Sequence, residues 1–344
     1  MKKTIVMLLA ILLLPLTCLA GGKKQGKTFT VLQWNIWQEG TMVKGGYEAI
    51  LNELERLRPD YVTFSEVRNY RDDFIARVCK DMAKRGVVYY GFRSDDTGLL
   101  SSTPITVHKT VFPLKDDHGS IYKLETKVCG RRLALYTSHL DYLNDTYYEV
   151  RGVDGNTFKE MEPLTDVDEI LRRNALSMRD KAIANFLKEA KRDQERGFIT
   201  IIGGDFNEPS VQDWTEQTRD LYDHHGVVIA WPQTTALIKA GFNDCYRTVH
   251  PNVLTHPGFT FPSDNPDVDP NKLTWAPKSD ERDRIDYLFF RGKGIKVTEC
   301  KLFGPEGNIA YAKRVPLGTD EPIITPLATW PTDHKGVLAT FVVE

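Results

Sequence analysis

Polar side chains follow or precede predicted strands along the whole chain, and these are the residues able to do chemistry. Glu66 follows the mostly apolar run 61–65, and Asp205 follows the apolar run 198–202 and two glycines. Carboxylate oxygens suit Mg²⁺, histidine exchanges protons near neutral pH, and strands hold such groups rigidly. The set, in chain order, is Asn35, Glu66, His139, Asp205, Asn207, Asp286, Asp333 and His334.

Taken singly, each of these residues has an ordinary structural explanation. Glu66 alone would be a solvated loop charge, Asn207 a turn residue, and Asp205 a helix cap or turn. Asp286 is harder to explain in that way, because its apolar neighbours predict a partly buried strand in which a carboxylate needs a partner. The functional interpretation therefore depends on the whole set.

The elements that must position these residues are mostly strands. Predicted strands cover residues 28–34, 61–64, 87–92, 106–112, 121–128, 133–138, 198–202, 285–290, 296–303 and 337–343. Predicted helices cover residues 47–58 and 170–190, the second with Leu171, Ala175, Met178, Ala182 and Phe186 facing inward. Several strands occur in succession, which favours α+β layers over an open nucleotide-binding sheet. Without a second linker or an internal repeat, we expect one domain over residues 28–344.

The N-terminus and the composition bear on the compartment and on the partner. Residues 1–20 have a basic start, an apolar run and a small-residue end, which predicts a signal peptide followed by a short polar lead at 21–27. We therefore expect an exported protein, periplasmic or secreted. A lipid anchor at Cys18 is less favoured, because the residues before it approach such a site poorly. Cleavage would remove Lys2 and Lys3 and take the formal charge from −2 to −4, which excludes a strongly basic nucleic-acid coat.

Four further cysteines leave the redox state open. They are Cys79, Cys129, Cys245 and Cys300. In an exported protein they can form two disulfides. A chain of 344 residues is also large enough to need no covalent staples, so four separate thiols are equally expected.

The order of the motifs, from Trp34-Asn35 through Gly204-Asp205-Phe206-Asn207 to Asp333-His334, resembles the endonuclease/exonuclease/phosphatase superfamily. This resemblance implies a four-layer α/β sandwich: two packed mixed β-sheets flanked by helices, with the site at one edge between them. The chain departs from the family pattern at two places. Ser65 stands where glutamine often precedes the metal glutamate, and Ser102 stands where arginine is usual.

The resemblance also implies a metal site. Glu66 is the principal expected ligand, with Asn35 nearby and Asp333 as a further ligand. The expected ion is Mg²⁺, with Mn²⁺ as the alternative, because hard oxygen ligands suit an ion that keeps several waters. Such an ion would help to neutralise the charge of a phosphate ester.

The remaining family positions imply the catalytic roles. Asp205 would orient or deprotonate the attacking water, and Asn207 would hold Asp205 and touch a phosphate oxygen. His334 would contact the scissile phosphate while Asp286 holds its imidazole. His139 would donate a hydrogen bond to a non-bridging oxygen. The implied activity is hydrolysis of a phosphodiester or phosphomonoester by in-line attack of an activated water.

The substrate stays open among several classes. Arg282 and Arg284, which flank Asp283, are candidate phosphate-binding residues, although solvated charges are an equal explanation. The alternatives are a nuclease on DNA or RNA, a sphingomyelinase-like lipid phosphodiesterase, a sugar- or inositol-phosphate phosphatase, and a non-catalytic binding protein on the same fold. The expected partner is thus a phosphate ester of nucleic acid, a lipid head group or a sugar, and we expect a monomer with no obligate protein partner.

Overall fold

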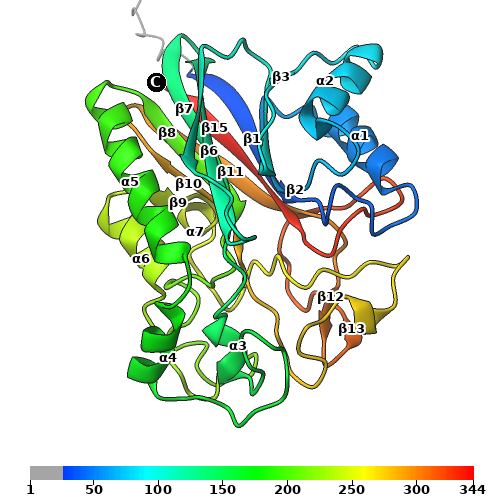
Figure 1. Ribbon diagram of the computed structural model, residues 1–344, viewed down its shortest axis with the longest axis vertical. Coiled ribbons are helices and arrows are strands. Elements are labelled where there is room, and N and C mark those ends of the chain that lie inside the picture. The colour runs from blue at the N-terminus through cyan, green and yellow to red at the C-terminus, as the bar shows by residue number, and fades with distance from the viewer. Residues whose placement is uncertain (1–25) are drawn as a thin grey trace, which may run out of the picture.

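The computed structural model describes residues 26–344 and is built around two large β-sheets (Figure 1). The seven-stranded sheet has the order β14 (Ile323–Ile324), β11 (Ile295–Phe303), β15 (Gly336–Val343), β1 (Lys27–Asn35), β2 (Tyr61–Val67), β4 (Asp96–Ser101) and β3 (Tyr90–Gly91). The six-stranded sheet has the order β5 (Val107–Phe112), β6 (Gly119–Val128), β7 (Arg131–Leu140), β8 (Ile199–Asp205), β10 (Asp286–Arg291) and β9 (Asn243–Asp244). A separate hairpin joins β12 (Asn308–Ala310) to β13 (Lys313–Val315).

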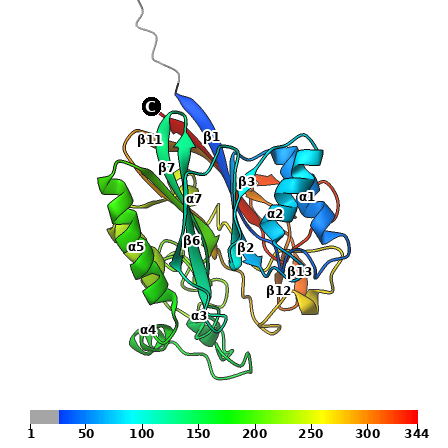
Figure 2. The same ribbon diagram turned by 45° about the horizontal axis from the view of Figure 1, so that its top comes forward.

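Helices cover the outer faces of both sheets. In Figures 1 and 2, α1 (Gly46–Leu57) and α2 (Phe74–Lys84) lie on one side, and α5 (Arg179–Glu195) lies on the other with α6 (Pro232–Lys239). Shorter helices lie in the connections: α3 (Thr146–Val150), α4 (Val167–Asn174), α7 (Cys245–Val249) and a 3₁₀ turn at Pro270–Lys272. This arrangement confirms the predicted four-layer α/β sandwich.

The core explains why the central strands are apolar on both faces. Along β1, Phe29 and Val31 face the other sheet, where they join Ile201 of β8 in the inter-sheet core. The alternate residues Leu32 and Trp34 face the opposite way and pack with the residues of α1 and α2. A strand covered on both sides in this manner becomes a continuous hydrophobic run.

Strand direction and register bring the polar set to one edge. The strands β1 and β2 run parallel to each other, and so do β7 and β8. His139 and Asp286 both stand opposite Asp205, on the two strands that flank β8. β15 runs antiparallel to β1, so the segment before it, with Asp333 and His334, reaches the same edge. Residues from six strand ends thereby converge.

The predicted helix over 170–190 is wrong in one respect, because the structure breaks it into α4 and α5. Arg179 lies at the break with its side chain buried, and it donates hydrogen bonds to Asp145 Oδ1 and Asn174 Oδ1, each at 2.6 Å. Ala175, expected to face inward, is exposed. A buried guanidinium must be hydrogen-bonded, and this requirement outweighs the continuous helix that the spacing of apolar residues predicts.

Other predictions are corrected or fall outside the described residues. The predicted strand 87–92 shortens to two residues, Tyr90–Gly91. The four cysteines of the described chain are free thiols, so of the two alternatives the four separate thiols are found and no disulfide forms among them. The predicted signal peptide at 1–20 lies outside the described residues, as does most of the lead at 21–27. Within residues 26–344 no helix has the length and apolarity needed to cross a bilayer.

Candidate active site

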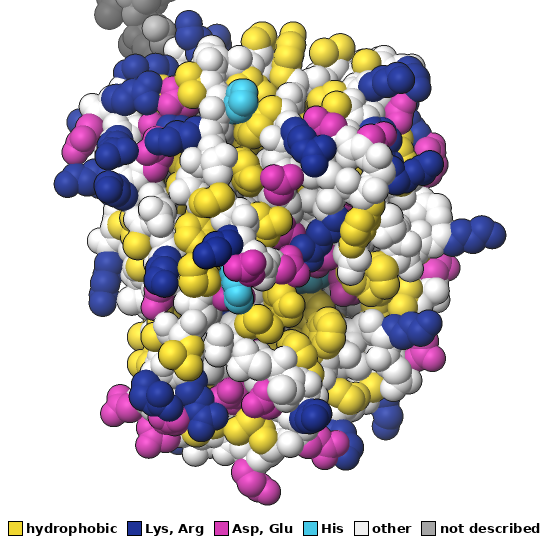
Figure 3. Space-filling view, in the orientation of Figure 1, with side chains coloured by type: hydrophobic (Ala, Val, Ile, Leu, Met, Phe, Trp, Pro, Cys, Tyr) yellow, Lys and Arg dark blue, Asp and Glu magenta, His cyan; other side chains and the backbone are white. Residues whose placement is uncertain are grey.

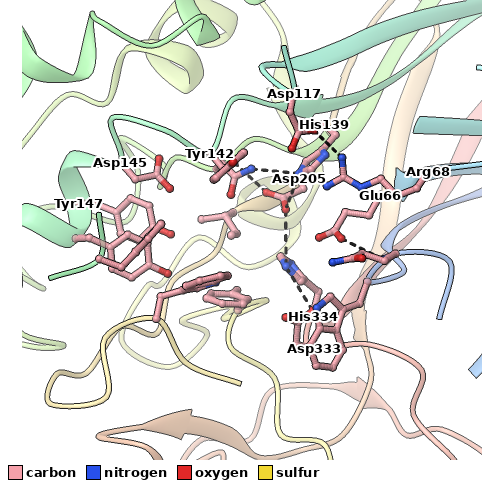
Figure 4. Close-up of a pocket in the computed structure, with 18 residues that line it drawn as sticks. Glu66, Arg68, Asp117, His139, Tyr142, Asp145, Tyr147, Asp205, Asp333 and His334 are labelled. Atoms are coloured by element: carbon pink, nitrogen blue, oxygen red, sulfur yellow. Dashed lines mark hydrogen bonds and ion pairs between the residues drawn. The ribbon is translucent and has the colours of Figure 1, made fainter. Parts of the chain in front are cut away.

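A cavity of about 270 Å³ opens at the edge where the strand ends meet (Figure 4). Six of the eight predicted polar residues line it: Glu66, His139, Asp205, Asn207, Asp333 and His334. The other two, Asn35 and Asp286, lie directly behind them and bond to them. The structure therefore brings the complete predicted set together.

His334, Asp286 and Asp205 form the centre of the cluster. His334 Nδ1 lies 2.8 Å from Asp286 Oδ2, and His334 Nε2 faces Asp205 Oδ2 at 3.8 Å. Burial by itself lowers the pKa of His334, but the charge and hydrogen bond of Asp286 outweigh it and raise the pKa to about 10. Burial and the charge of Asp286 raise the pKa of Asp205 to about 6. A cationic imidazole thus stands beside a carboxyl that is able to exchange a proton near neutral pH.

Asn35 connects this centre to Glu66. Its Nδ2 lies 3.1 Å from Glu66 Oε1, 2.9 Å from Asp205 Oδ2 and 3.3 Å from His334 Nε2. Its Oδ1 accepts the backbone N–H of Trp37 at 2.9 Å. Asn35 therefore turns its amide nitrogen toward the site, and its expected place as a metal ligand stays a prediction. Asn35 holds Glu66 and Asp205 in place.

A β-bulge aims Glu66 into the cavity. In regular alternation Glu66 would follow Val62 and Phe64 onto the helix-covered face of β2. The register shifts between Ser65 and Val67, so Val67 takes the apolar place and Glu66 adopts a φ of 65°. Bulges re-aim side chains in this way, and a positive φ at glutamate indicates a conformation that the surrounding structure enforces. Glu66 Oε2 then accepts the backbone N–H of Gln38 at 3.1 Å.

Ser65 supports the site from beneath. Its Oγ accepts the backbone N–H of Asp205 at 3.1 Å and Gln33 Nε2 at 3.2 Å, and it donates to the carbonyl of Ser138 at 2.9 Å. The hydroxyl is fully buried and joins both sheets. The serine that departs from the family pattern is thus a structural tie beneath Asp205, and its sequence context alone carries no signal of this.

His139 belongs to a second carboxylate–imidazole pair, which the sequence did not predict. Its Nδ1 lies 2.8 Å from Asp96 Oδ2, and its Nε2 lies 3.3 Å from Asn207 Nδ2. Burial lowers the pKa of His139, but the charge and hydrogen bond of Asp96 outweigh it and raise the pKa to about 9. Asn207 also donates its backbone N–H to Asp205 Oδ1 at 2.9 Å. Asn207 therefore links the two pairs.

Arg68, which the sequence offers as a further candidate for a cationic phosphate pocket beside Arg282 and Arg284, is the guanidinium of the site. Its Nη1 lies 2.8 Å from Asp96 Oδ1 and 2.7 Å from Asp117 Oδ1, at the wall of the cavity. Figure 4 shows it beside Glu66. Arg68 follows Glu66 by two positions across the bulge, and that proximity was the available signal.

Arg282 and Arg284 do not line the cavity, which corrects their assignment as substrate-binding residues. Arg284 is buried, with Nη1 2.6 Å from Asp244 Oδ2 and Nε 2.9 Å from Asp213 Oδ2. Arg282 pairs with Asp280 at 2.6 Å. Both guanidinium groups are therefore saturated by carboxylates and serve packing.

The donor chemistry fits a hard divalent cation. Glu66 and Asp333 present carboxylates to the cavity, and burial and the charge of Glu66 raise the pKa of Asp333 to about 7. A cation would relieve that repulsion. Among the described residues, ligand atoms of Asp205, Asp286 and His334 also lie within 4.8 Å of one another. In that group His334 and Asp286 already bond to each other, so we regard Glu66 and Asp333 as the better ligands.

Comparisons with known proteins agree with this geometry. A family model described as the Endonuclease/Exonuclease/phosphatase family matches residues 32–334. The Caenorhabditis elegans protein named Uncharacterized protein F14F9.5 is 25% identical over 344 residues, which cover 98% of this chain and 99% of that relative.

Solved structures show the same fold at low identity. Truncated TDP2 of Caenorhabditis elegans superposes with a TM-score of 0.52 at 18% identity, over 92% of this chain and 98% of that one. TDP2 of D. rerio, complexed with a single-strand DNA product, superposes with a TM-score of 0.50 at 18% identity, over 91% of this chain and 98% of that one. The human Nocturnin catalytic domain with a bound sulfate superposes with a TM-score of 0.50 at 17% identity, over 92% of this chain and 95% of that one.

Proposed function

Because the chain belongs to the Endonuclease/Exonuclease/phosphatase family, we propose that it is a divalent-metal-dependent phosphoesterase that hydrolyses a phosphodiester. The observation that carries the proposal is the convergence of Glu66, Asp205 and His334 at one small cavity, each held by a second polar residue. Such support for each reactive group is what a preorganised catalytic site requires.

The residues divide the work of hydrolysis between them. Asp205, held by the N–H of Asn207, orients the attacking water and takes its proton. His334, kept cationic by Asp286, contacts the phosphate and stabilises the charge that develops on it. His139, which Asp96 keeps cationic from its Nδ1 side, donates to a non-bridging oxygen from Nε2.

Glu66 and Asp333 would hold the cation, which supplies charge neutralisation for the phosphate oxygens. We propose Mg²⁺, with Mn²⁺ as a substitute, because the donors are carboxylate oxygens. The electrostatics support the need for it. Five carboxylates line the cavity against one guanidinium and two imidazoles, and all three basic groups are already paired with Asp96, Asp117 or Asp286. A phosphate anion would be repelled without a cation.

The same charge balance favours a diester over a monoester. A monoester carries close to two negative charges at neutral pH, whereas a diester carries one. The basic side chains among the described residues that line the cavity are Arg68, His139 and His334, and each already lies against a carboxylate: Arg68 against Asp96 and Asp117, His139 against Asp96, and His334 against Asp286. A second phosphate charge would therefore lack a partner.

The test is hydrolysis of bis(p-nitrophenyl) phosphate and of p-nitrophenyl phosphate with Mg²⁺ and with EDTA. We expect Mg²⁺-dependent turnover with preference for the diester. We expect Asp205→Asn to lower kcat by about 10²- to 10⁴-fold with an unchanged Tm, and the exposed Glu216→Gln to leave both unchanged. Turnover that persists in EDTA, or near-wild-type rates in Asp205→Asn, would contradict the proposal. Absence of any turnover would favour a binding protein on this fold.

A nuclease is the second candidate, and plasmid DNA and RNA are the substrates that test it. We propose further that the protein is exported through cleavage near residue 20, because residues 1–20 have the signal-peptide pattern. N-terminal sequencing of the protein recovered outside the cytoplasm would show a start near Gly21, and a start at Met1 would contradict this.

A further inference from the structure

The cavity extends beyond the catalytic residues into a wall of aromatic rings. Its members, called here the aromatic wall, are Tyr147, Tyr148, Phe158 and Trp275. Successive rings touch: Tyr147 and Tyr148 have centroids 4.4 Å apart, Tyr148 and Phe158 5.7 Å, and Phe158 and Trp275 4.7 Å. The wall is therefore one continuous surface and not a scatter of single rings.

Tyr147 of the aromatic wall lies across the catalytic centre from Glu66, the principal candidate cation ligand (Figure 4). In Figure 4, Tyr147 stands on one side of Asp205 and His334, and Glu66 and Arg68 stand on the other. A phosphate placed over the centre thus has the acidic, cation-binding part of the cavity on one side and apolar rings on the other. The part of the substrate that lies toward the rings must match them.

Tyr147 and Tyr148 are buried in a core cluster against which Phe158 packs, and Trp275 brings this aromatic cluster to the surface at the cavity. Trp275 is 55% exposed although its ring packs on Phe158, and an exposed aromatic patch beside a cavity is typical of a ligand site. Trp37 lines the cavity as well and continues with Trp275 into a neighbouring groove. Figure 3 shows hydrophobic side chains gathered around a hollow near the centre of the molecule.

The kind of side chain indicates the kind of ligand. The described lining has seven aromatic residues and a single aliphatic one, Ile285. A site for an alkyl chain can be lined by aliphatic side chains, whereas stacked rings add a geometric preference for another flat ring. A ring that stacks on an aromatic side chain gains from its π-face whatever its substituents.

We propose that the aromatic wall binds a planar aromatic ring carried by the phosphate ester, so that the substrate is a small ester with a nucleobase or a phenolic ring. The inference rests on the proposed function, because it places the phosphate over Asp205 and His334. The cavity volume of about 270 Å³ supports a small molecule or a chain end over the interior of a polymer.

Equilibrium binding with Ca²⁺ in place of Mg²⁺ tests the wall separately from turnover. Calorimetric titrations compare the methyl diester of adenosine 5′-monophosphate with that of ribose 5-phosphate, and the methyl diester of phenyl phosphate with that of cyclohexyl phosphate; each diester is named below by its parent phosphate. Each pair keeps the phosphate and changes only the ring. We expect the aromatic member of at least one pair to bind on the order of tenfold more tightly. The pair with the larger ratio identifies the nucleobase or the phenolic ring.

Variants of the exposed ring make the assignment residue-specific. We expect Trp275→Leu to bring the ratio of the two dissociation constants toward one while ribose 5-phosphate binds as before. Trp275→Phe should keep most of the preference, and Tyr311→Leu, at an exposed tyrosine that does not line the cavity, should keep all of it. Because Trp275 is half exposed, folding of the variants should be preserved, and Tm checks this.

The outcomes separate the two claims. Equal binding within both pairs, or cyclohexyl phosphate binding as tightly as phenyl phosphate with no nucleobase preference, would overturn the aromatic assignment. An equal loss of affinity for all four ligands in Trp275→Leu would also overturn the aromatic assignment. Mg²⁺-dependent turnover without any ring preference would leave the proposed function intact and refute the wall. Ring-selective binding without turnover would support the aromatic wall and contradict the proposed function.

Discussion

The pair formed by His139 and Asp96 allows the sharpest test of the site, through Asp96→Asn. This change keeps the shape of the side chain and removes the charge that holds the pKa of His139 at about 9 against burial. Without that charge, burial should bring the pKa to about 6.5 or below. The fall of about 2.5 units corresponds to roughly 3 kcal/mol between the two protonation states.

The consequence for activity depends on pH. At pH 8 about nine-tenths of His139 is protonated in the wild type, and about 3% would be protonated in the variant at a pKa of 6.5. Since Nε2 must carry a proton to donate to the phosphate, kcat/KM should fall about 30-fold at pH 8. At pH 6 most of His139 is protonated in both proteins, so the deficit should shrink to about twofold or less.

The assay is the ratio of wild-type to variant kcat/KM from pH 5.5 to 8.5, with the pKa of His139 followed by NMR. Asp95→Asn is the matched control, because Asp95 neighbours Asp96 but its side chain is about half exposed and pairs with Arg93 at 3.8 Å rather than with a histidine. A loss in Asp96→Asn of equal size at every pH would mean that Asp96 only positions residues. An unchanged rate at pH 8 would refute the role of His139.

Three further outcomes are expected. Ser65→Ala should lower the free energy of unfolding by about 1–3 kcal/mol, because the backbone N–H of Asp205 loses its buried acceptor. Urea denaturation measures this free energy, and a loss below a few tenths of a kcal/mol would contradict the prediction. Burial raises the pKa of Glu208 to about 7, so this carboxyl binds its proton more tightly when folded, and stability should fall as pH rises from about 4.5 to about 7. In Glu208→Gln, up to about 3 kcal/mol of this pH-dependent fall in the free energy of unfolding should disappear. A variant whose stability depends on pH as the wild type does would refute the assignment. Glu66→Gln should raise the Mg²⁺ concentration for half-maximal rate about tenfold or more, whereas Asp286→Asn should lower kcat with little change in that concentration; the reverse pattern would place the cation between Asp205, Asp286 and His334.

Much of the site was accessible from the sequence because its signals are local. Apolar runs of strand length place Glu66 and Asp205 at strand ends, and the order of motifs predicts the family and the layered fold. The eight polar residues meet in the structure because strand ends of adjacent, registered strands meet at one edge. These eight residues could therefore be chosen without knowledge of which strands pair or in what register.

The partners of those residues were not accessible. Asp96 reaches His139 from the other sheet, 43 positions away in the chain, and Ser65 ties Asp205 across 140 positions. Such contacts depend on how the two sheets pack, and no short-range pattern reports it. The same reason explains why Arg284 was misassigned, since Asp213 and Asp244, which neutralise it, come from distant segments. Arg282 instead pairs with Asp280, two positions before it, away from the cavity.

The sequence by itself determined which residue types stand at the strand ends, the order in which they occur, and therefore the family and the layered architecture. These properties follow from strand periodicity and apolar runs, which are local along the chain. Only the tertiary structure decided which imidazole pairs with which carboxylate, which arginine reaches the cavity, and that Trp275 joins the rings of Tyr147, Tyr148 and Phe158 in one wall. Those outcomes depend on the packing of segments far apart in the chain, where burial and charge neutralisation select the partner.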